Sequence, residues 1–490
     1  MQKISRLTPT PNKEHFAPVA KMNSLRLFLT LVAMFSMWTV QIDVKTAFLN
    51  APLPANSRIF VKPAKGLITV MSQMASVLGK HIPPQVTSML HKLKEGASLL
   101  LKKSLYGLRD APQLWNEFIH KYLISLKFQS LVYDPCFYFY MSGSTIVLLL
   151  LYVDDIIIAS NDQHRVDYLS SELGKRFRIT SKDLSKYLNI RIRHIRDKQQ
   201  VLLDLSDYIV KMFARFKLLP KPSVKTPMQE NLQLLREEEM SAEESAYVAD
   251  FPYQEMLGAA LYICVCMMPI IAYAVHVLSR FSKQPTRKTC QALTRLMQFI
   301  YNVRDMPLIL GGPRGLPRLV AYTDSDWAAD PETRKSMIGV LIFIGWGCIE
   351  WMCTQQNHPA LSSGEAEFVN ITPACKLVEY YRHVFGCLGF EMKCATTIWC
   401  DNTSAVIISK NAVHPKRTRH IAAKYFKVRE LQKHGVVLVA YIPTSDNRAD
   451  IFTKSLGYVL FWEHGDFIMG GVLPPISDRH VPTSDLDLIY

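Results

Sequence analysis

Two long apolar stretches stand out in the first third of the chain. The first, residues 25–40, is interrupted by one arginine and several hydroxyl side chains, whereas the second, residues 146–159, contains two adjacent aspartates. A membrane span needs about 20 apolar residues, and two charges inside hydrocarbon would be costly, so neither stretch fits a span. The pattern instead predicts a buried helix over residues 21–37, a strand over residues 38–44, and a buried strand pair over the second stretch.

Weaker patterns surround these two stretches. Residues 107–126 are typical of a turn followed by a helix, because apolar residues recur there at helical spacing. A strand over residues 135–140, the Ser142-Gly143 turn and the apolar run that follows together predict a hairpin. Residues 68–98 form a less patterned insert, and residues 1–15 form a polar, proline-containing extension.

The second half of the chain changes pattern at two boundaries. Pro220-Lys-Pro222 and the acidic stretch over residues 230–244 mark a linker region, and a largely helical block follows over residues 253–304. After the second boundary, Gly311 to Pro317, strands alternate with helices, which predicts an α/β or α+β domain of roughly 140 residues. The strands are expected over residues 319–323, 337–344, 349–351, 397–400 and 437–441, and the helices over residues 365–388 and 404–409.

The composition and net charge limit the class of protein and the kind of partner to be expected. The chain has 490 residues, enough for two to four domains, and its 49% apolar and 20% charged residues indicate a globular protein. A net charge of +15 suits either a nucleic-acid partner or a generally basic surface. The 10 cysteines lack zinc-site spacing, so free thiols in a reducing compartment are expected.

The paired carboxylates Asp154 and Asp155 lie between two apolar runs. Asp does not belong in a buried strand unless it is paired or binds a metal, so a turn facing a cleft is expected. Asp43, at the end of another predicted strand, supplies a third carboxylate. Hard oxygen ligands of this kind hold Mg²⁺ together with substrate phosphates. We call Asp43, Asp154 and Asp155 the first acid set.

A second group of acids lies in the C-terminal region. Asp324 and Asp401 each end a predicted strand, Glu367 opens a helix, and Asp450 precedes a short apolar segment. Two strand ends and two helix starts can converge on one edge of a sheet, where four acids would repel one another unless metals neutralise them. That is the requirement of two-metal phosphodiester hydrolysis. We call these four residues the second acid set.

Three ordered segments resemble the reverse transcriptase of copia-type LTR retrotransposons. They are Gln41-Ile-Asp-Val-Lys-Thr-Ala-Phe-Leu-Asn50, Leu101-Lys-Lys-Ser-Leu-Tyr-Gly-Leu-Arg-Asp-Ala-Pro112 followed by Trp115, and Leu149-Leu-Leu-Tyr-Val-Asp-Asp-Ile156. The second acid set, in its order, resembles the ribonuclease H of the same elements. In that pattern Asp324 matches better than Asp326, and Glu367 matches better than Glu365.

The resemblance implies a multidomain α+β and α/β fold. It comprises a reverse transcriptase palm, which is an antiparallel sheet with helices, a helical thumb or connection, and a ribonuclease H-like α/β domain. The implied division is an extension over residues 1–15, a fingers remnant and palm over 16–218, a linker with helical thumb or connection over 219–317, a ribonuclease H-like domain over 318–458 and a C-terminal tail over 459–490.

The resemblance also implies site residues. Both acid sets would be catalytic metal ligands, with two Mg²⁺ ions per active site and Mn²⁺ as a substitute. Phe48 falls where the family has an aromatic gate against the ribose 2′-hydroxyl, and Tyr106, Gly107 and Arg109 fall where it meets the nucleotide and template. The basic segment 410–420, with Lys424 and Lys427, is either a phosphate-contact surface or a solvated helix face.

The function implied is RNA-directed DNA polymerase with ribonuclease H activity, from a retrotransposon Pol polyprotein that serves DNA integration. Its partners would be an RNA template, a DNA primer, the RNA–DNA hybrid and deoxynucleoside triphosphates, with no membrane, in a cytoplasmic retrotransposon particle or in the nucleus. The family's fingers begin upstream of Phe16, so an N-terminally truncated portion is expected. The alternative is a non-polymerising relic or a repurposed nucleic-acid-binding protein.

Overall fold

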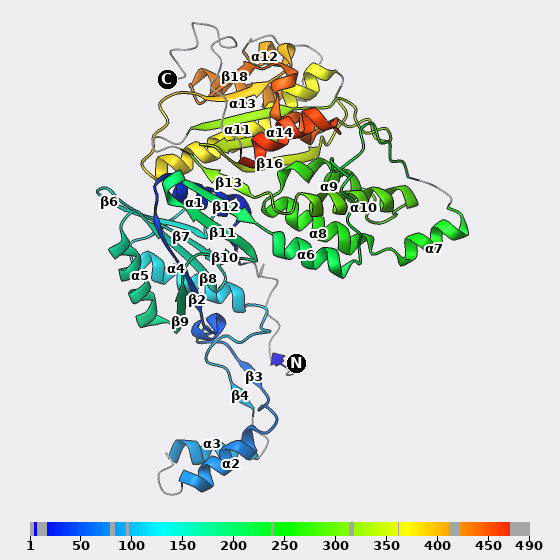
Figure 1. Cartoon of the computed structure of the whole chain (residues 1–490). Coiled ribbons are helices and arrows are strands. Elements are labelled where there is room, and N and C mark those ends of the chain that lie inside the picture. The colour runs from blue at the N-terminus through cyan, green and yellow to red at the C-terminus, as the bar shows by residue number, and fades with distance from the viewer. Residues whose placement is uncertain are drawn as a thin grey trace.

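The structure is a computed structural model that describes residues 4–6, 17–78, 84–94, 98–236, 240–312, 318–360, 362–410 and 422–470. An antiparallel sheet with its helices lies below a C-terminal mixed sheet, and a helical body lies beside both (Figure 1). A narrow arm extends from the first sheet, away from the rest of the chain. The fold is therefore a combination of sheets and helices in several bodies, as the sequence predicted.

The first sheet has six antiparallel strands in the order β5-β6-β7-β8-β2-β9. The predicted hairpin and the predicted buried strand pair are both present in it, because β6 pairs with β7 and β7 pairs with β8. Helix α5 packs on β2, β8 and β9, and the side chains from Val147 to Leu151 of β7 and from Ile156 to Ala159 of β8 are buried. The bounds are β2 (Trp38–Val44), β5 (Gln129–Ser130), β6 (Phe137–Ser142), β7 (Thr145–Tyr152), β8 (Asp155–Ser160), β9 (Ile179–Lys182), α4 (Ala111–Ser125) and α5 (Gln163–Arg176).

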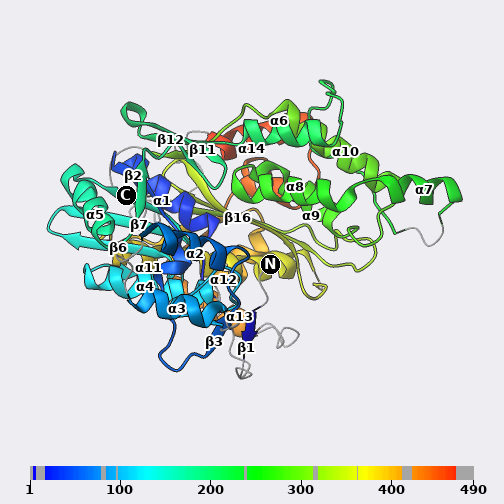
Figure 2. The same cartoon turned by 90° about the horizontal axis from the view of Figure 1, so that it is seen from below.

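Helix α1 (Met22–Met34) lies at the junction of the bodies, where it contacts β7, β12, β13 and β16 (Figure 2). Every residue from Ser24 to Met34 is buried, which confirms the predicted buried helix. The arginine inside it, Arg26, is satisfied: its Nε donates to the carbonyl of Ile349 at 2.6 Å and its Nη1 to that of Val265 at 2.6 Å. A charged residue is tolerated in this core because backbone carbonyls replace its water.

A four-stranded antiparallel sheet, β10-β11-β12-β13, joins the first sheet to the helical body. Gly311 ends β13 with φ +122°, and a Cβ there would lie 2.2 Å from the carbonyl oxygen of Gln199, so only glycine fits. The helical body confirms the block predicted over residues 253–304. The bounds are β10 (Lys186–Tyr187), β11 (Ile190–Ile195), β12 (Gln200–Asp204), β13 (Leu308–Gly311), α6 (Ser206–Arg215), α7 (Ala242–Asp250), α8 (Tyr253–Cys266), α9 (Ala272–Ser279) and α10 (Arg287–Asn302).

The C-terminal sheet has the order β16-β15-β14-β17-β18, antiparallel as far as β14 and parallel from β14 to β18. Helix α11 packs on β14, β15 and β17. The predicted alternation of strands and helices is confirmed. The bounds are β14 (Leu319–Asp324), β15 (Met337–Ile344), β16 (Gly347–Gln355), β17 (Thr396–Cys400), β18 (Val437–Tyr441), α11 (Ser363–Cys387), α12 (Thr403–Lys410), α13 (Ala422–Lys433) and the 3-10 helix η7 (Arg448–Phe452).

The sequence pattern missed elements at both ends of the chain. Within the expected tail, residues 459–490, the described part belongs to helix α14 (Tyr458–Gly470), which packs against β13, β16 and η7. Within the expected loose extension, β1 (Ile4–Arg6) pairs with β3 (Ile59–Val61), and the other residues up to 16 lie outside the described ones. Both elements are stabilised by partners distant in sequence, which local patterning does not reveal.

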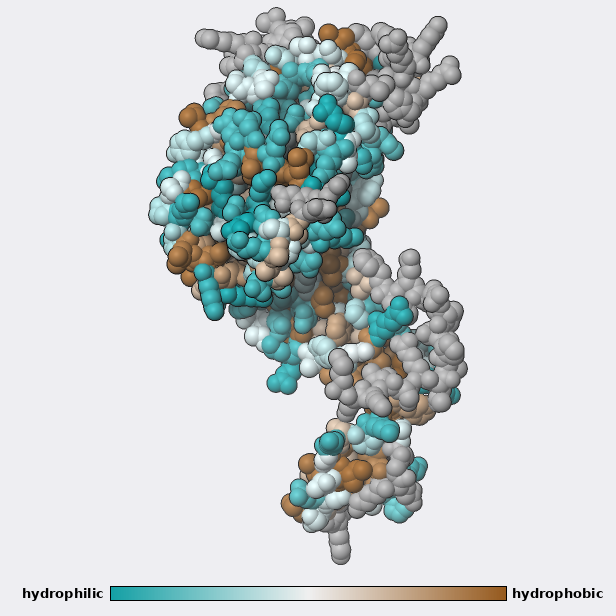
Figure 3. Space-filling view, turned by 90° about the vertical axis from the view of Figure 1, so that its right-hand side faces the viewer, coloured by the Kyte–Doolittle hydropathy of each residue, from teal (hydrophilic) through white to brown (hydrophobic). Residues whose placement is uncertain are grey.

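The insert over residues 68–98 also contains structure that the pattern did not predict. Helices α2 (Leu67–Leu78) and α3 (Pro84–Lys94) form the end of the arm, beyond the short strands β3 and β4 (Leu99–Leu100). Apolar side chains gather on this arm (Figure 3), and Val70, Met74, Val77 and Met89 are exposed there.

No helix in the described part of the chain is both long and apolar enough to cross a membrane. All ten cysteines are free, and most of them are buried.

Candidate functional site

The turn between β7 and β8 carries the first two acids. Tyr152 pairs directly with Asp155, so Val153 and Asp154 form a two-residue turn, and Val153 has φ +57°. A β-branched residue in the left-handed region is strained, and it persists only where its surroundings hold it. Here the indole Nε1 of Trp115 donates to the carbonyl of Val153 at 2.6 Å. The turn therefore has a fixed shape that presents both carboxylates.

Asp43 on β2 lies directly opposite Asp155 on β8 in the strand register. The backbone N–H of Val44 donates to the carbonyl of Asp154 at 2.9 Å, which ties the turn to β2. Burial raises the pKa of Asp155; a hydrogen bond from Gln41 lowers it, and the charges of Asp154 and Asp43 raise it further. The first acid set thus concentrates negative charge at one end of the sheet, where a cation would be stabilised.

The three carboxylates of the first acid set do not form a tight ligand cluster. Among the described His, Cys, Asp and Glu residues, only two groups of three have ligand atoms within 4.8 Å of one another, and both include Asp401, at the end of β17. Asp43 is instead ion-paired with Lys45, two residues further along. The residues suit Mg²⁺ by their chemistry, but the structure brings their backbones together rather than their oxygens.

The expected nucleotide-contact residues lie beside this turn. Phe48, in the 3-10 helix η1 (Ala47–Asn50), packs against Tyr106 with ring centroids 4.8 Å apart. Burial, then the charges of Asp154 and Asp43, raise the pKa of Tyr106, so its hydroxyl lies near the acids. Gly107 and Arg109, the other two expected contact residues, are both exposed. Gly107 has φ +93°, a backbone conformation that favours glycine.

The second acid set converges as the sequence predicted. Strands β14 and β17 are parallel neighbours, with Thr323 opposite Cys400, so Asp324 and Asp401 leave the same edge of the sheet. Glu367 reaches this edge from the second turn of α11, and its Oε1 accepts from the backbone N–H of Ser325 at 3.0 Å. The acids therefore come from four elements that meet at one point.

The fourth acid, Asp450, lies in η7. The buried side chain of Asn447 donates to the carbonyl of Thr323 at 3.1 Å and caps η7 by accepting from the N–H of Ala449. Asn447 thus fixes the start of η7 on β14 and brings Asp450 beside Asp324. Asn447 was not predicted to belong to the site, although asparagine is a preferred residue at the start of a helix.

Burial distinguishes this cluster from surface acids. Asp324, Glu367 and Asp450 are 4%, 5% and 1% exposed. Burial and the neighbouring carboxylates raise the pKa of Asp324 and of Glu367 well above their ordinary values, and burial also raises that of Asp450. Lys454 lies 2.8 Å from Asp450 Oδ2, and the hydroxyl of Thr453 donates to Asp324.

The second acid set fits a divalent cation. Oxygens of Asp324, Asp401 and Asp450 lie within 4.8 Å of one another, and Asp450 Oδ1 is buried with no hydrogen bond from any described residue. One ammonium group, from Lys454, does not balance four carboxylates. The competing residue Asp326 is half-buried and lies outside both ligand groups. Glu365 lies in the first turn of α11, where its backbone N–H donates to the side chain of the cap residue Ser362.

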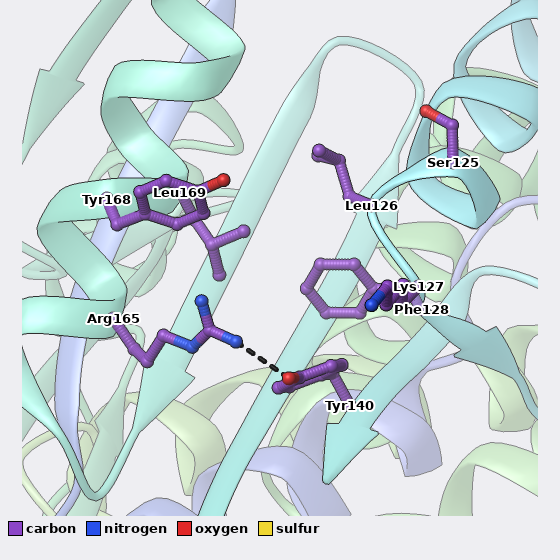
Figure 4. A pocket seen from close by; sticks show the side chains of 8 residues that line it. All are labelled: Ser125, Leu126, Lys127, Phe128, Tyr140, Arg165, Tyr168 and Leu169. Carbon is purple, nitrogen blue, oxygen red and sulfur yellow. Dashed lines mark hydrogen bonds between the residues drawn. The ribbon is translucent and has the colours of Figure 1, made fainter. Parts of the chain in front are cut away.

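One pocket lies beside the first sheet. It has a volume of about 220 Å³ and lies between the end of α4, β6 and α5, where Arg165 donates to the Tyr140 hydroxyl at 2.7 Å (Figure 4). No residue of either acid set lines this pocket.

In the expected basic segment, residues 411–421 and the side chain of Lys424 lie outside the described residues, whereas Lys427 is ion-paired with Glu379 at 2.7 Å.

Residues 84–230 match a protein-family model described as reverse transcriptase (RNA-dependent DNA polymerase). The matched segment includes Tyr106, Gly107, Arg109 and the turn with Asp154 and Asp155. Asp43 and the whole C-terminal sheet lie outside it.

Curated relatives extend the similarity to most of the chain. The retrovirus-related Pol polyprotein from transposon TNT 1-94 of Nicotiana tabacum is 33% identical over 446 residues, which is 90% of this chain and 31% of that protein. The corresponding polyprotein from transposon RE1 of Arabidopsis thaliana is 29% identical over 465 residues, 94% of this chain and 29% of that protein. The chain therefore spans less than a third of the length of these relatives.

Among solved structures, LC11-RNase H1 isolated from compost by a metagenomic approach is 17% identical. Its TM-score is 0.23, and the match covers 28% of this chain and 92% of that one.

Proposed function

Because the chain belongs to the retrovirus-related Pol polyproteins of copia-type transposons, we propose that it synthesises DNA on an RNA template and degrades the RNA strand of the resulting hybrid. The observation that carries the proposal is the presence of two separate carboxylate sites. One lies at a strained turn inside the segment that matches the reverse transcriptase model. The other is buried at the parallel edge of the C-terminal sheet.

In this proposal the bodies of the fold take the roles of a polymerase. The six-stranded sheet with α4 and α5 is the palm, within residues 16–218. The helical body is the thumb or connection, within residues 219–317, and the C-terminal sheet with α11 to α13 is the ribonuclease H-like domain, within residues 318–458. The buried contacts of α14 favour extending that last domain to residue 470.

Asp43, Asp154 and Asp155 would hold Mg²⁺ at the polymerase site. The bound ions would lower the pKa of the primer 3′-hydroxyl and stabilise the charge of the leaving pyrophosphate. Phe48 and Tyr106 pack together beside this turn, where Phe48 would meet the sugar of the incoming deoxynucleoside triphosphate and exclude a 2′-hydroxyl. Gly107 allows the left-handed backbone conformation that directly follows Tyr106, and exposed Arg109 would contact the triphosphate or the template.

Asp324, Glu367, Asp401 and Asp450 would hold Mg²⁺, with Mn²⁺ as a substitute, at the ribonuclease site. The burial of Asp324, Glu367 and Asp450 favours this role, because an acid cluster kept out of water binds a cation more strongly than an exposed one. The metal would supply a hydroxide nucleophile for the RNA phosphodiester bond. Asn447 and Ser325 hold Asp450 and Glu367 in place for that reaction.

The proposed partners are an RNA template, a DNA primer, their hybrid and deoxynucleoside triphosphates. The net charge of +15 favours such polyanions. We further propose that the protein acts in a cytoplasmic retrotransposon particle or in the nucleus, and that the DNA it makes is the substrate of integration.

Primer extension on an RNA template tests the proposal directly. Full-length protein should extend a labelled DNA primer in Mg²⁺, and Asp154→Asn should reduce extension at least about 100-fold because one metal ligand becomes neutral. Asp162→Asn is the matched control, since Asp162 caps α5 on the same sheet and lies outside the acid set. Cleavage of hybrid RNA without any primer extension would instead favour the alternative, a nucleic-acid-binding protein that does not polymerise.

A further inference from the structure

Helix α14 lies where the helical body meets the C-terminal sheet (Figure 1). On one side Phe461 packs against Phe299 of α10, with ring centroids 5.6 Å apart. On the other side Phe467 packs against Phe343 of β15 at 5.2 Å. The helix also contacts η7, the element that contains Asp450. Residues in α14 can therefore act on the second acid set without touching it.

A buried histidine forms the polar contact between α14 and η7. His464 is fully buried, and its Nδ1 lies 2.8 Å from Nη1 of Arg448, the first residue of η7. Arginine only donates hydrogen bonds, so Nδ1 must be the acceptor and the ring proton must be on Nε2. Burial, together with the charges of Arg448 and Lys454, lowers the pKa of His464 to about 3, so the ring is neutral at working pH.

The other ring nitrogen of His464, Nε2, makes a histidine energetically unfavourable at this core position. Nε2 is buried and has no hydrogen-bond partner among the described residues. An unpaired buried N–H is unfavourable, and a leucine would fill much of the same space without it. What a leucine could not supply is the acceptor for Arg448.

Three residues of α14 contact the side chain of Arg448. Besides His464, the carboxylate of Glu463 lies 3.5 Å from its Nη1, and its guanidinium lies 5.0 Å from the ring centroid of Phe467. Asn447, the preceding residue, is bonded to β14. The start of η7, two residues before Asp450, is therefore fixed between β14 and α14.

We propose that His464, acting through Arg448, is a positioning residue that orients Asp450 and thereby sets the affinity of the second acid set for its divalent cation. The inference rests on the proposed ribonuclease H function. It assigns a role to a helix that the sequence pattern treated as a tail. Groups that orient metal ligands without touching the metal commonly change metal affinity about 10- to 100-fold when they are removed.

The test compares His464→Leu, which removes the acceptor, with His464→Asn, whose Oδ1 replaces Nδ1. Full-length variants are assayed for cleavage of a labelled RNA–DNA hybrid over a range of MgCl₂ concentrations. His464→Leu should raise the concentration for half-maximal cleavage about 10-fold or more, with much of the maximal rate recovered at saturation. His464→Asn should restore the wild-type value to within about threefold, and primer extension should be unchanged in both.

Phe461→Leu is the control for packing, because Phe461 is buried in α14 and packs against Phe299, whereas the ring beside Arg448 is that of Phe467. It should leave the Mg²⁺ dependence unchanged even where it lowers the melting temperature. An unchanged Mg²⁺ dependence in His464→Leu, an equal change in Phe461→Leu, or no restoration by His464→Asn would each overturn the proposal.

Metal-induced stabilisation is a second readout that does not need catalysis. The MgCl₂ or MnCl₂ concentration giving half of the maximal rise in melting temperature should increase for His464→Leu but not for Phe461→Leu. If the wild-type protein cleaved no hybrid, the proposed function would fail, yet this comparison would still decide whether His464 sets cation affinity. Identical curves for His464→Leu and wild type would refute it.

Discussion

The buried ion pair between Asp330 and Arg280 links the C-terminal sheet to the helical body. The Asp330 side chain is 1% exposed and accepts from Arg280 Nη2 at 2.6 Å, from Gln355 Nε2 at 2.8 Å, from the N–H of Glu332 at 3.1 Å, and from the hydroxyl of Thr333. Burial alone would raise the pKa of Asp330. The hydrogen bonds and then the Arg280 charge outweigh burial and lower this pKa to about 2.

The pKa shift gives the size of the effect. The ordinary value is 3.8, so the folded state favours the ionised carboxylate by about 1.8 pH units, or about 2.4 kcal/mol. Because the folded-state pKa is depressed, this stabilisation is fully present above the unfolded-state pKa. It is lost as pH falls toward 2, and about half is lost by pH 3. Asp330→Asn should therefore lower the free energy of unfolding by about 2–3 kcal/mol at pH 7 and by clearly less at pH 3.

Urea unfolding of wild type and Asp330→Asn at pH 7 and at pH 3 measures this difference. Asp305→Asn is the matched control, since its side chain is 77% exposed and its pairing with Arg304 at 3.5 Å should contribute little. A loss below about 0.5 kcal/mol at pH 7, or an equal loss at both pH values, would refute the assignment of Asp330 as a strong link between the two bodies.

Three further outcomes follow from the two acid sets. Glu367→Gln should abolish hybrid cleavage. Because the pKa of Glu367 is raised in the folded state, its contribution to the stability of the metal-free protein is present below the unfolded-state pKa and is lost as pH rises. In EDTA the variant should therefore have a higher melting temperature than wild type at pH 7 but not at pH 4. Trp115→Phe should remove the bond to Val153, lower the free energy of unfolding by about 1–2 kcal/mol and slow primer extension while hybrid cleavage continues, and equal loss of both activities would contradict this. Phe48→Ala should increase ribonucleotide incorporation about 10-fold or more in a primer-extension assay, whereas an unchanged preference would exclude Phe48 as the gate.

The sequence predicted that the second acid set would converge, because this geometry follows from strand order. Asp324 and Asp401 each come directly after an apolar strand, and parallel neighbours end at the same edge of a sheet. The first acid set was predicted only in outline. The left-handed conformation of Val153 depends on contacts of the turn with Trp115 and β2, which are distant in sequence. The ion pair of Asp43 with Lys45 depends on side-chain conformations, which the pattern of apolar and polar residues does not predict.

Helix α14 shows where local patterning fails. Its apolar residues lie on several faces, because different bodies cover it from different sides, so no single stripe marks it as amphipathic. Helix α1 is also buried, yet it was predictable because it lies within a longer and mostly apolar stretch, residues 25–40, that contains a single arginine. The polar contact of His464 with Arg448 depends on both elements being in place, and nothing near either residue in the sequence indicates it.

One assay tests the central claim that two separate sites carry out two reactions. The substrate is a DNA primer annealed to an RNA template, with distinct labels on the two strands, and the proteins are wild type, Asp154→Asn and Asp401→Asn. We predict that wild type extends the primer and cleaves the template, that Asp154→Asn only cleaves, and that Asp401→Asn only extends. Extension by Asp154→Asn, cleavage by Asp401→Asn, or loss of both activities in either folded variant would contradict the account.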